Sequence, residues 1–166
     1  MTEDALRAVA DRQEITELLY RYCRAVDRID PAFGYPLFHE DAVADYGDVY
    51  QGDGRGAIDF ICNQHKHTLG TSHQVTNVII QLDGDRAASE AYATAHIRVK
   101  RDDQLLQMTV LTRYLDVWSR RGGRWGVDKR VTVMDFDDIA PVTPIRSASG
   151  MTQDRNDPSY SVLKEC

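Results

Sequence analysis

The chain has 166 residues, a formal net charge of −6 and an apolar fraction of 42%. This length fits one domain, and no stretch approaches the roughly 18 consecutive apolar residues of a membrane-spanning helix. Acidic residues outnumber basic ones and no long basic block occurs, so nucleic acid is a poor candidate partner. The N-terminus lacks the basic and apolar regions of a secretory signal, which predicts an intracellular, cytoplasmic protein.

The cysteines and histidines predict no disulfide framework and no metal site. Cys23, Cys62 and Cys166 are odd in number and lack CxxC spacing. The first two fall in apolar-periodic segments, where a reduced thiol packs as a small apolar side chain. His65 and His67 are two residues apart, a spacing that does not converge on a metal ion in a helix.

The most secure predicted helix covers residues 11–27. Apolar side chains recur there at steps of three and four, as on a helix with one buried face. Asp11 and Glu14 have the form of a capping box, although apolar residues from Ala5 onwards leave the start of the helix open.

Two further helices and one strand are predicted before residue 70. A short helix follows Asp30-Pro31 and a strand follows in residues 41–46. A third helix opens after the glycine-rich stretch 47–56 and ends at residues 65–67. Its glycines at 52, 54 and 56 lack the spacing of a phosphate loop and are interpreted as turn glycines.

Residues 70–136 predict four long strands, cut by turn signals at residues 83–84, 101–103 and 121–123. Short connections make neighbouring strands antiparallel, so the chain is predicted to be an α+β domain with N-terminal helices packed on an antiparallel sheet. The domain is expected to span residues 1–136. Residues 137–166, rich in Pro and Ser, form an extended C-terminal tail of the same domain.

Asp27 and His73 are the leading candidates for acid–base chemistry. Strand alternation places His73 on one face with Val75, Asn77 and Ile79, a polar and apolar mixture that suits a ligand pocket. If the Asp27 carboxylate accepts a hydrogen bond from the His73 imidazole, it fixes the tautomer of the ring and raises its basicity, so that His73 can act as a general base. The alternatives are a solvated helix-end aspartate and a histidine satisfied by backbone or water.

Tyr22 and Arg130 are the other catalytic candidates. The Tyr22 hydroxyl could donate a hydrogen bond to a leaving hydroxyl or an enolate oxygen. The alternative is that Tyr22 is a core residue without a role in catalysis. Arg130 shares a strand face with Thr132, Met134 and Phe136. It could hold an anionic or carbonyl group, or cover apolar surface with its stem.

Four residues are candidate substrate-binding side chains: Asn77, His96, Tyr46 and Met134. His96 shares a face with Tyr92, Thr94 and Arg98 and is either a second pocket imidazole or an outward-facing residue. His39, His65 and His67 are interpreted as solvated loop and helix-end residues.

Several segments together resemble the nuclear transport factor 2-like superfamily in its SnoaL-like branch. They are Val26-Asp27, Leu37-Phe38-His39-Glu40-Asp41-Ala42, Ser72-His73-Gln74-Val75-Thr76-Asn77 and Asn156-Asp157-Pro158-Ser159-Tyr160. The resemblance covers nearly the whole chain. It implies a conical α+β barrel, in which helices and a strongly curved sheet enclose one cavity.

Within this superfamily, the polar residues are most similar to those of bile acid 7α-dehydratase and hexachlorocyclohexane dehydrochlorinase. Asp27 and His73 match the acid–histidine dyad of these eliminating enzymes, and Arg130 matches an arginine after the last strand's tryptophan motif. Tyr22 matches the dehydratase's tyrosine, where the dehydrochlorinase has lysine. His96 corresponds to the second histidine of the more distant scytalone dehydratase.

The resemblance implies a cofactor-independent lyase of the dehydratase type, acting on a small apolar substrate such as a steroid or a polyketide. The enzyme alternative is an isomerisation like that of ketosteroid isomerase, or a cyclisation. The third possibility is a non-catalytic ligand-binding protein or the small subunit of a ring-hydroxylating oxygenase. Apolar residues between Leu105 and Trp118, assigned to the outer face of the sheet, predict a homo-oligomer, either a dimer or a trimer.

Overall fold

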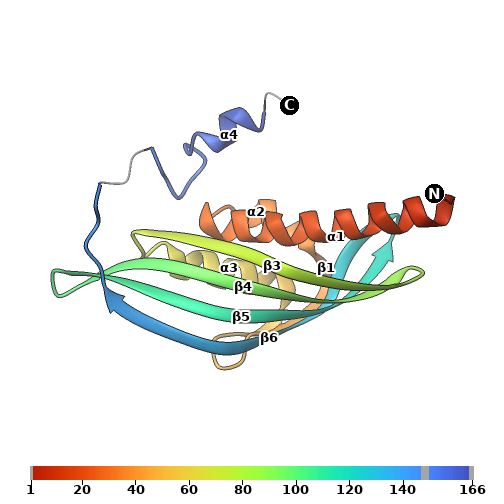
Figure 1. The fold of residues 1–166 in the computed structure, drawn as a ribbon, viewed down its shortest axis with the longest axis horizontal. Helices are drawn as coiled ribbons and strands as arrows, with labels where there is room; N and C mark the ends of the chain where they lie inside the picture. Colours follow the sequence, from red (N-terminus) through yellow and green to blue (C-terminus); the bar gives the residue numbers. More distant parts are fainter. Residues whose placement is uncertain (1, 147–149, 165–166) are drawn as a thin grey trace.

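The computed structural model describes residues 2–146 and 150–164 of the chain. Helices cover one side of a six-stranded sheet whose strands follow the order β2-β1-β6-β5-β4-β3 (Figure 1). The predicted α+β class is therefore confirmed. The elements in chain order are α1 (Glu3–Asp27), α2 (Pro31–Gly34), the 3-10 turn η1 (Tyr35–Leu37), β1 (Phe38–Asp45), β2 (Gln51–Asp53), α3 (Gly54–His65), β3 (Gly70–Asp83), β4 (Arg86–Arg101), β5 (Gln104–Arg121), β6 (Arg124–Pro141) and α4 (Ser159–Val162). Within the described ranges, no helix is long and apolar enough to cross a membrane.

Helix α1 begins earlier than the capping-box pattern indicates. Its N-cap is Thr2, whose hydroxyl accepts a hydrogen bond from the Ala5 N–H at 3.3 Å. Asp11 instead lies inside the helix and is 6% exposed, with both carboxylate oxygens bonded to the Arg120 guanidinium at 2.8 and 2.7 Å. The interpretation of Asp11 as a cap is therefore wrong, because its carboxylate binds the β5–β6 hairpin.

The four long strands form the predicted meander. β4 and β5 are joined by residues 102–103, and β5 and β6 by residues 122–123. Both residues of each loop have positive φ, from 48° to 81°, which is the geometry of the tight turn that matches the twist of two antiparallel strands. The turn signals in the sequence therefore predict the ends of β4 and β5 and the starts of β5 and β6 correctly.

The sheet is mixed, whereas the sequence predicts an antiparallel one. β1 is antiparallel to β2 but pairs in parallel with β6. A parallel pair requires a long connection, and here almost the whole domain separates the two strands. The addition of β1 beyond β6 encloses the core between the sheet, α1 and α3 (Figure 1).

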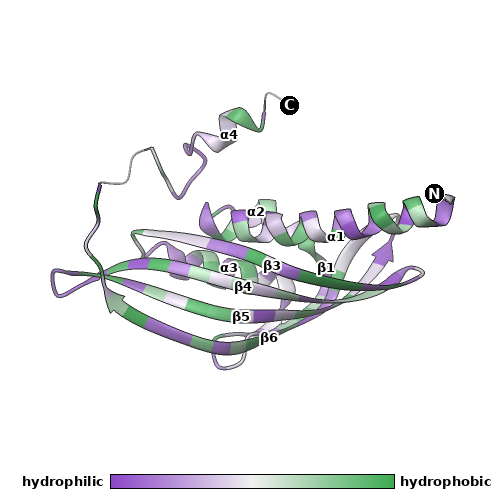
Figure 2. Cartoon of the chain, in the orientation of Figure 1, coloured by the Kyte–Doolittle hydropathy of each residue, from purple (hydrophilic) through white to green (hydrophobic). Residues whose placement is uncertain are grey.

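Small residues on β4 make room for large ones on β5. Ala87 is paired with Trp118 and Ala91 with Tyr114, and all four side chains are buried. Hydrophilic and hydrophobic residues alternate along the long strands (Figure 2), as expected for a sheet with one face on the core.

The chain after β6 returns to the end of α1. β6 itself runs through Pro141, beyond the predicted tail boundary at residue 136. The segment carrying α4 then lies over the C-terminal end of α1 (Figure 1), where Arg24 donates to Ser159 Oγ at 2.8 Å and Arg28 to the Thr152 carbonyl at 2.7 Å. Cys23 and Cys62 are buried free thiols as predicted, and Cys166 lies outside the described residues.

Candidate active site

Asp27 and His73 meet where the end of α1 contacts the edge of the sheet. The His73 Nδ1–H donates to Oδ1 of Asp27 at 2.7 Å. The backbone N–H of His73 donates to Oδ2 of the same carboxylate at 2.9 Å. β3 is an edge strand, so this N–H has no neighbouring strand to pair with on that side. The carboxylate therefore fixes both the backbone and the ring of His73.

The environment of the pair keeps Asp27 ionised. The His73 and Asp27 side chains are 8% and 12% exposed. Burial by itself raises the pKa of Asp27, but the hydrogen bonds from the ring and the backbone of His73 oppose it, and this pKa lies below the ordinary value. Because Nδ1 carries the proton given to the carboxylate, Nε2 is the nitrogen with a lone pair, and the ring can act as a base.

His65 is a third member of this cluster and was missed from the sequence. It was interpreted as solvated, yet it is 5% exposed at the end of α3 and its ring centroid lies 5.2 Å from that of His73. Its Nδ1–H donates to the Val26 carbonyl at 2.8 Å, which fixes the last turn of α1 beside Asp27. Burial lowers the pKa of His65, and the adjacent His73 lowers it further, so His65 is neutral. The signal was present, since His65 follows Ile58 by seven residues on the buried helix face.

Another histidine that was interpreted as solvated is also buried. His39 is 5% exposed on β1, and its Nε2 lies 3.0 Å from the Ser119 carbonyl. A side chain at Gly126 would approach the His39 ring to 2.9 Å, so the strand β6 needs glycine at this position. His39 therefore belongs to the packing between β1 and the β5–β6 hairpin and lies apart from the dyad.

The hollow beside the dyad is a groove that opens to solvent, with a volume of about 690 Å³. It lies between α1, the edge strand β3 and the returning C-terminal segment. The lining residues are Tyr20, Cys23, Arg24, Asp27 and Arg28 of α1, His73, Gln74, Val75 and Thr76 of β3, and Asp157 and Ser159 of the C-terminal segment. A small molecule in this groove would contact His73 directly.

Arg130 lies in the core and binds Asp116. Its side chain is 0% exposed, and Nε and Nη2 donate to the two Asp116 oxygens at 2.7 Å each. Asp116 was not among the residues predicted from the sequence, although its place between Tyr114 and Trp118 on an apolar strand face puts a carboxylate in the core. Two of the three guanidinium nitrogens are thus bonded to this one carboxylate.

Three tyrosines surround this ion pair. The Tyr22 and Tyr46 hydroxyls are 3.1 Å apart, and Arg130 Nη1 donates to Tyr46 Oη at 3.5 Å. The guanidinium carbon lies 4.9 Å from the Tyr22 ring centroid and 4.2 Å from that of Tyr114. Burial raises the pKa of Tyr22 well above its ordinary value, so this hydroxyl is a neutral hydrogen-bond donor.

Cys23 lies between the Asp27–His73 pair and the Arg130–Asp116 pair, and the charges of Asp27 and Arg130 both act on its thiol. It lies one helical turn before Asp27, lines the groove, and is 7% exposed. Burial raises the pKa of its thiol to about 12; the charge of Asp27 raises it and that of Arg130 lowers it. The thiol is therefore protonated and does not provide a nucleophile at neutral pH.

The structure places Asn77 away from His73. A register shift lies between Thr76 and Ile79, and Asn77 has a φ of 50°. The extra residue reverses the alternation, so Val78 packs against the core while Asn77 and Ile79 are exposed. The expectation that Asn77 and Ile79 share the face of His73 is therefore wrong.

His96 also lies on the far side of the sheet from the dyad. The register pairs His96 with Ser72, the neighbour of His73, so the two imidazoles project to opposite faces. The His96 Nδ1 lies 3.4 Å from Thr109 Oγ1, on the outer surface. The outward-facing alternative in the sequence analysis is the correct one.

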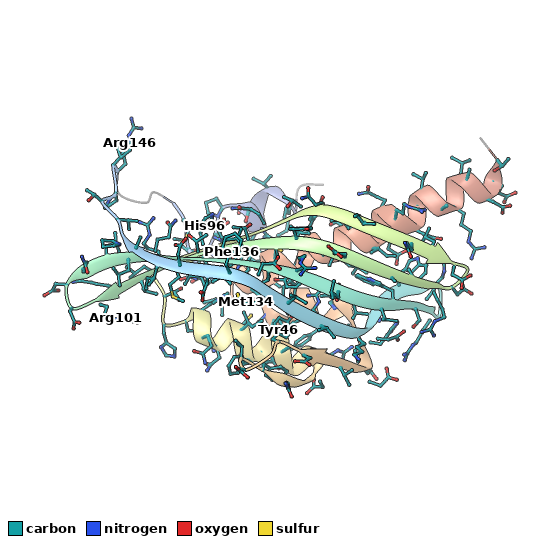
Figure 3. The ribbon with its side chains drawn as sticks, turned by 60° about the horizontal axis from the view of Figure 1, so that its bottom comes forward. Tyr46, His96, Arg101, Met134, Phe136 and Arg146 are labelled. Atoms are coloured by element: carbon teal, nitrogen blue, oxygen red, sulfur yellow. The ribbon has the colours of Figure 1, made fainter. Side chains whose placement is uncertain are left out.

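Tyr46 and Met134 lie on the side of the molecule that carries α3 (Figure 3). Tyr46 belongs to the tyrosine cluster described above, whereas Met134 is 50% exposed. Phe136, expected on the same strand face as Arg130, is 61% exposed, because a register shift between Leu111 and Thr112 of β5 reverses the alternation of β6 before this residue.

Comparisons with known proteins agree with this architecture. The sequence matches the SnoaL-like domain family over residues 7–131, and it matches no curated protein. Among solved structures, LinA is similar with a TM-score of 0.74 and 18% identity, covering 87% of this chain and 98% of that chain. The hexachlorocyclohexane dehydrochlorinase LinA-type3 from Novosphingobium barchaimii LL02 gives a TM-score of 0.72 at 17% identity, with 87% and 99% covered. A scytalone dehydratase candidate from Novosphingobium aromaticivorans gives 0.69 at 20% identity, with 86% and 97% covered.

Proposed function

The chain belongs to the SnoaL-like family of the nuclear transport factor 2-like superfamily, and from this premise we propose that it is a cofactor-independent lyase of the dehydratase type. Its substrate is a small, largely apolar molecule with a hydroxyl group β to a carbonyl, or δ to an α,β-unsaturated carbonyl. Removal of a proton α or γ to the carbonyl starts the elimination of water. Structural neighbours named as a dehydrochlorinase and as a dehydratase candidate support this reaction class.

One observation carries the proposal: the 2.7 Å bond between His73 Nδ1 and Asp27 Oδ1 in the wall of a groove. In a general base, the carboxylate partner holds the ring in one tautomer and stabilises the imidazolium that forms. Asp27 satisfies this requirement because its pKa is held low and its second oxygen is anchored by the backbone of His73.

The remaining residues are assigned roles in the same reaction. Nε2 of His73 takes the proton from carbon, the C–O bond to the leaving hydroxyl breaks, and the imidazolium returns the proton so that water leaves. Tyr22 and Tyr46 do not line the groove, so their hydroxyls, which lie 3.1 Å apart, are assigned a supporting role behind it and make no contact with the substrate. Arg130, held by Asp116, orients this pair through its Nη1 contact with Tyr46.

The test is a set of β-hydroxy ketones incubated with the protein in D2O and followed by NMR. We expect an unsaturated product with the wild type and a loss of about 10²–10⁴-fold in turnover for Asp27→Asn and for His73→Gln. His67→Gln is the matched control, because His67 is exposed in the turn after α3. Full turnover in both dyad variants would overturn the assignment.

The product also distinguishes the competing reactions. Deuterium uptake with a shifted double bond and no loss of water would show an isomerisation. Neither exchange nor elimination, combined with ligand binding, would show a non-catalytic protein.

We further propose that the outer face of the meander forms an interface between copies of this chain. Leu111 and Leu115 are partly exposed there and Val117 is 38% exposed, whereas Trp118, which was expected on this face, is 0% exposed and belongs to the core. Light scattering coupled to size-exclusion chromatography should give a dimer or trimer mass, which Leu115→Glu should reduce to that of a monomer. A monomeric wild type would contradict this proposal.

A further inference from the structure

Four charged side chains line the groove around the dyad, and three of them have a salt-bridge or hydrogen-bonded partner of complementary type. Asp27 pairs with His73, and Arg28 pairs with Asp157 at 2.9 Å. Arg24 also lines the groove, but it has no carboxylate within ion-pair distance in residues 2–146 and 150–164. A guanidinium is always charged, so Arg24 presents to the groove a positive charge that no ion pair in the described residues satisfies.

Arg24 is held in place by neutral groups. Nη1 donates to Ser159 Oγ at 2.8 Å, and the guanidinium carbon lies 4.5 Å from the Tyr160 ring centroid and 5.5 Å from that of Phe33. Its Nε is buried and has no hydrogen-bond partner among the described residues. The side chain is thus fixed by rings on two elements, and its guanidinium, which has no carboxylate partner among the described residues, can bind an anionic oxygen in the groove.

We propose that Arg24 binds an acidic group of the substrate and thereby sets its position against His73. This inference rests on the proposed function, because it assigns the substrate class of the same groove. Arg24 precedes Asp27 by three residues, which is about 4.5 Å along a helix. A single small molecule can therefore reach both the guanidinium and the dyad, with its apolar body against Cys23 and Val75. The substrate class is an apolar carbon skeleton bearing one carboxylate or similar anionic oxygen group.

Two fluorescent probes with the same apolar body test this inference without turnover. 8-Anilinonaphthalene-1-sulfonate carries an anionic group, and N-phenyl-1-naphthylamine lacks it. The wild type should bind the anionic probe at least tenfold more tightly than the neutral one. Arg24→Gln should remove this preference, Arg24→Lys should retain part of it, and His67→Gln, at an exposed position outside the groove, should leave it unchanged. Equal binding of the two probes by the wild type, or a full preference in Arg24→Gln, would overturn the inference.

A second measurement uses only the wild type and Ser159→Ala, in case Arg24→Gln does not fold. Displacement of the anionic probe by 1-naphthoate, 1-naphthyl phosphate and 1-naphthamide compares a carboxylate, a phosphate and a neutral amide. The acids should displace it at concentrations at least tenfold lower than the amide in both proteins, and the better acid identifies the group. Displacement by the amide at the same concentration would contradict the inference.

The two proposals can fail separately. An anion preference that depends on Arg24, found without any elimination activity, supports this inference and contradicts the lyase. Elimination from neutral substrates that is unchanged in Arg24→Gln supports the lyase and contradicts this inference.

Discussion

Two buried pairs, each containing a carboxylate, lie on the inner side of the sheet, and they differ in whether the partner of the carboxylate keeps a nitrogen without a hydrogen bond. The Arg130 and Asp116 side chains are both 0% exposed. The Arg130 guanidinium donates two parallel hydrogen bonds of 2.7 Å to the Asp116 carboxylate, and aromatic rings surround the guanidinium. In the Asp27–His73 pair, one ring nitrogen is bonded, and Nε2 has no hydrogen-bond partner among the described residues. The pair also forms part of the wall of an open groove.

The difference shows that burial of charge does not by itself mark a reactive site. A saturated ion pair has no donor or acceptor left for a substrate, so its role is to hold neighbouring groups. A neutral imidazole that is hydrogen-bonded to a carboxylate and has its second nitrogen free at the edge of a groove can take up a proton. Arg130 and His73 are both catalytic candidates from the sequence, but Arg130 lies in the core whereas His73 lines the groove.

The largest expected effect on stability comes from breaking the saturated pair. Asp116→Asn leaves the Arg130 charge uncompensated in the core and should lower the free energy of unfolding by about 3–5 kcal/mol. Urea unfolding followed by circular dichroism measures this change. The double variant Asp116→Leu/Arg130→Met should recover most of the loss, because apolar side chains of similar volume replace the pair.

The dyad supplies the matched comparison. Asp27→Asn keeps an oxygen acceptor at a partly exposed site, so it should lower the free energy of unfolding by less than Asp116→Asn. An equal or larger loss would mean that Asp27 is also a structural residue, and the contrast between the pairs would be lost.

The sequence predicted most of the fold and part of the site. The long strands were predicted because turn residues such as Asp102, Asp103 and Gly122 have short-range signals that tertiary packing did not override. The Asp27–His73 pair was expected from strand alternation and from the helix margin. The first residues of β3 keep this alternation, because the register shift begins only after Thr76.

The errors came from interactions between distant segments. The parallel pairing of β1 with β6 has no local signal. The shift at Asn77 reverses every inward residue after it, as a single inserted residue does in a strand. The Asp116 partner of Arg130, fourteen positions earlier, has no local signal either, because the pairing follows from the register of β5 and β6.

A smaller effect concerns acid stability near the dyad. The pKa of His65 is lowered in the folded state, so its contribution to stability is present above the unfolded value of about 6.5 and is lost as the pH falls towards the folded value. Asp27, whose pKa is also lowered, contributes above about 3.9 and loses its contribution at lower pH. Urea unfolding at pH values from 7.5 to 4 should therefore show a decline that begins near neutrality.

Substitution of His65 separates the first part of this decline. His65→Gln retains an N–H that can donate to the Val26 carbonyl, and it should flatten the decline just below pH 6.5. His67→Gln, at an exposed position, should leave the decline unchanged. A decline of unchanged slope in His65→Gln would show that the buried His65 ring is not its source.

The smallest effect tests the shift in β3 that separates Asn77 from the dyad. Asn77 adopts a φ of 50°, a left-handed conformation that Asn and Gly tolerate and β-branched residues do not. Asn77→Val should therefore reduce the free energy of unfolding by ~1–2 kcal/mol, while Asn77→Gly should change it by a few tenths. Gln81→Val, at an exposed position of the same strand with regular pairing, is the control and should stay within about 0.5 kcal/mol. If Asn77→Val were tolerated as well as Gln81→Val, regular alternation would extend through β3 and Asn77 would point to the same side as His73.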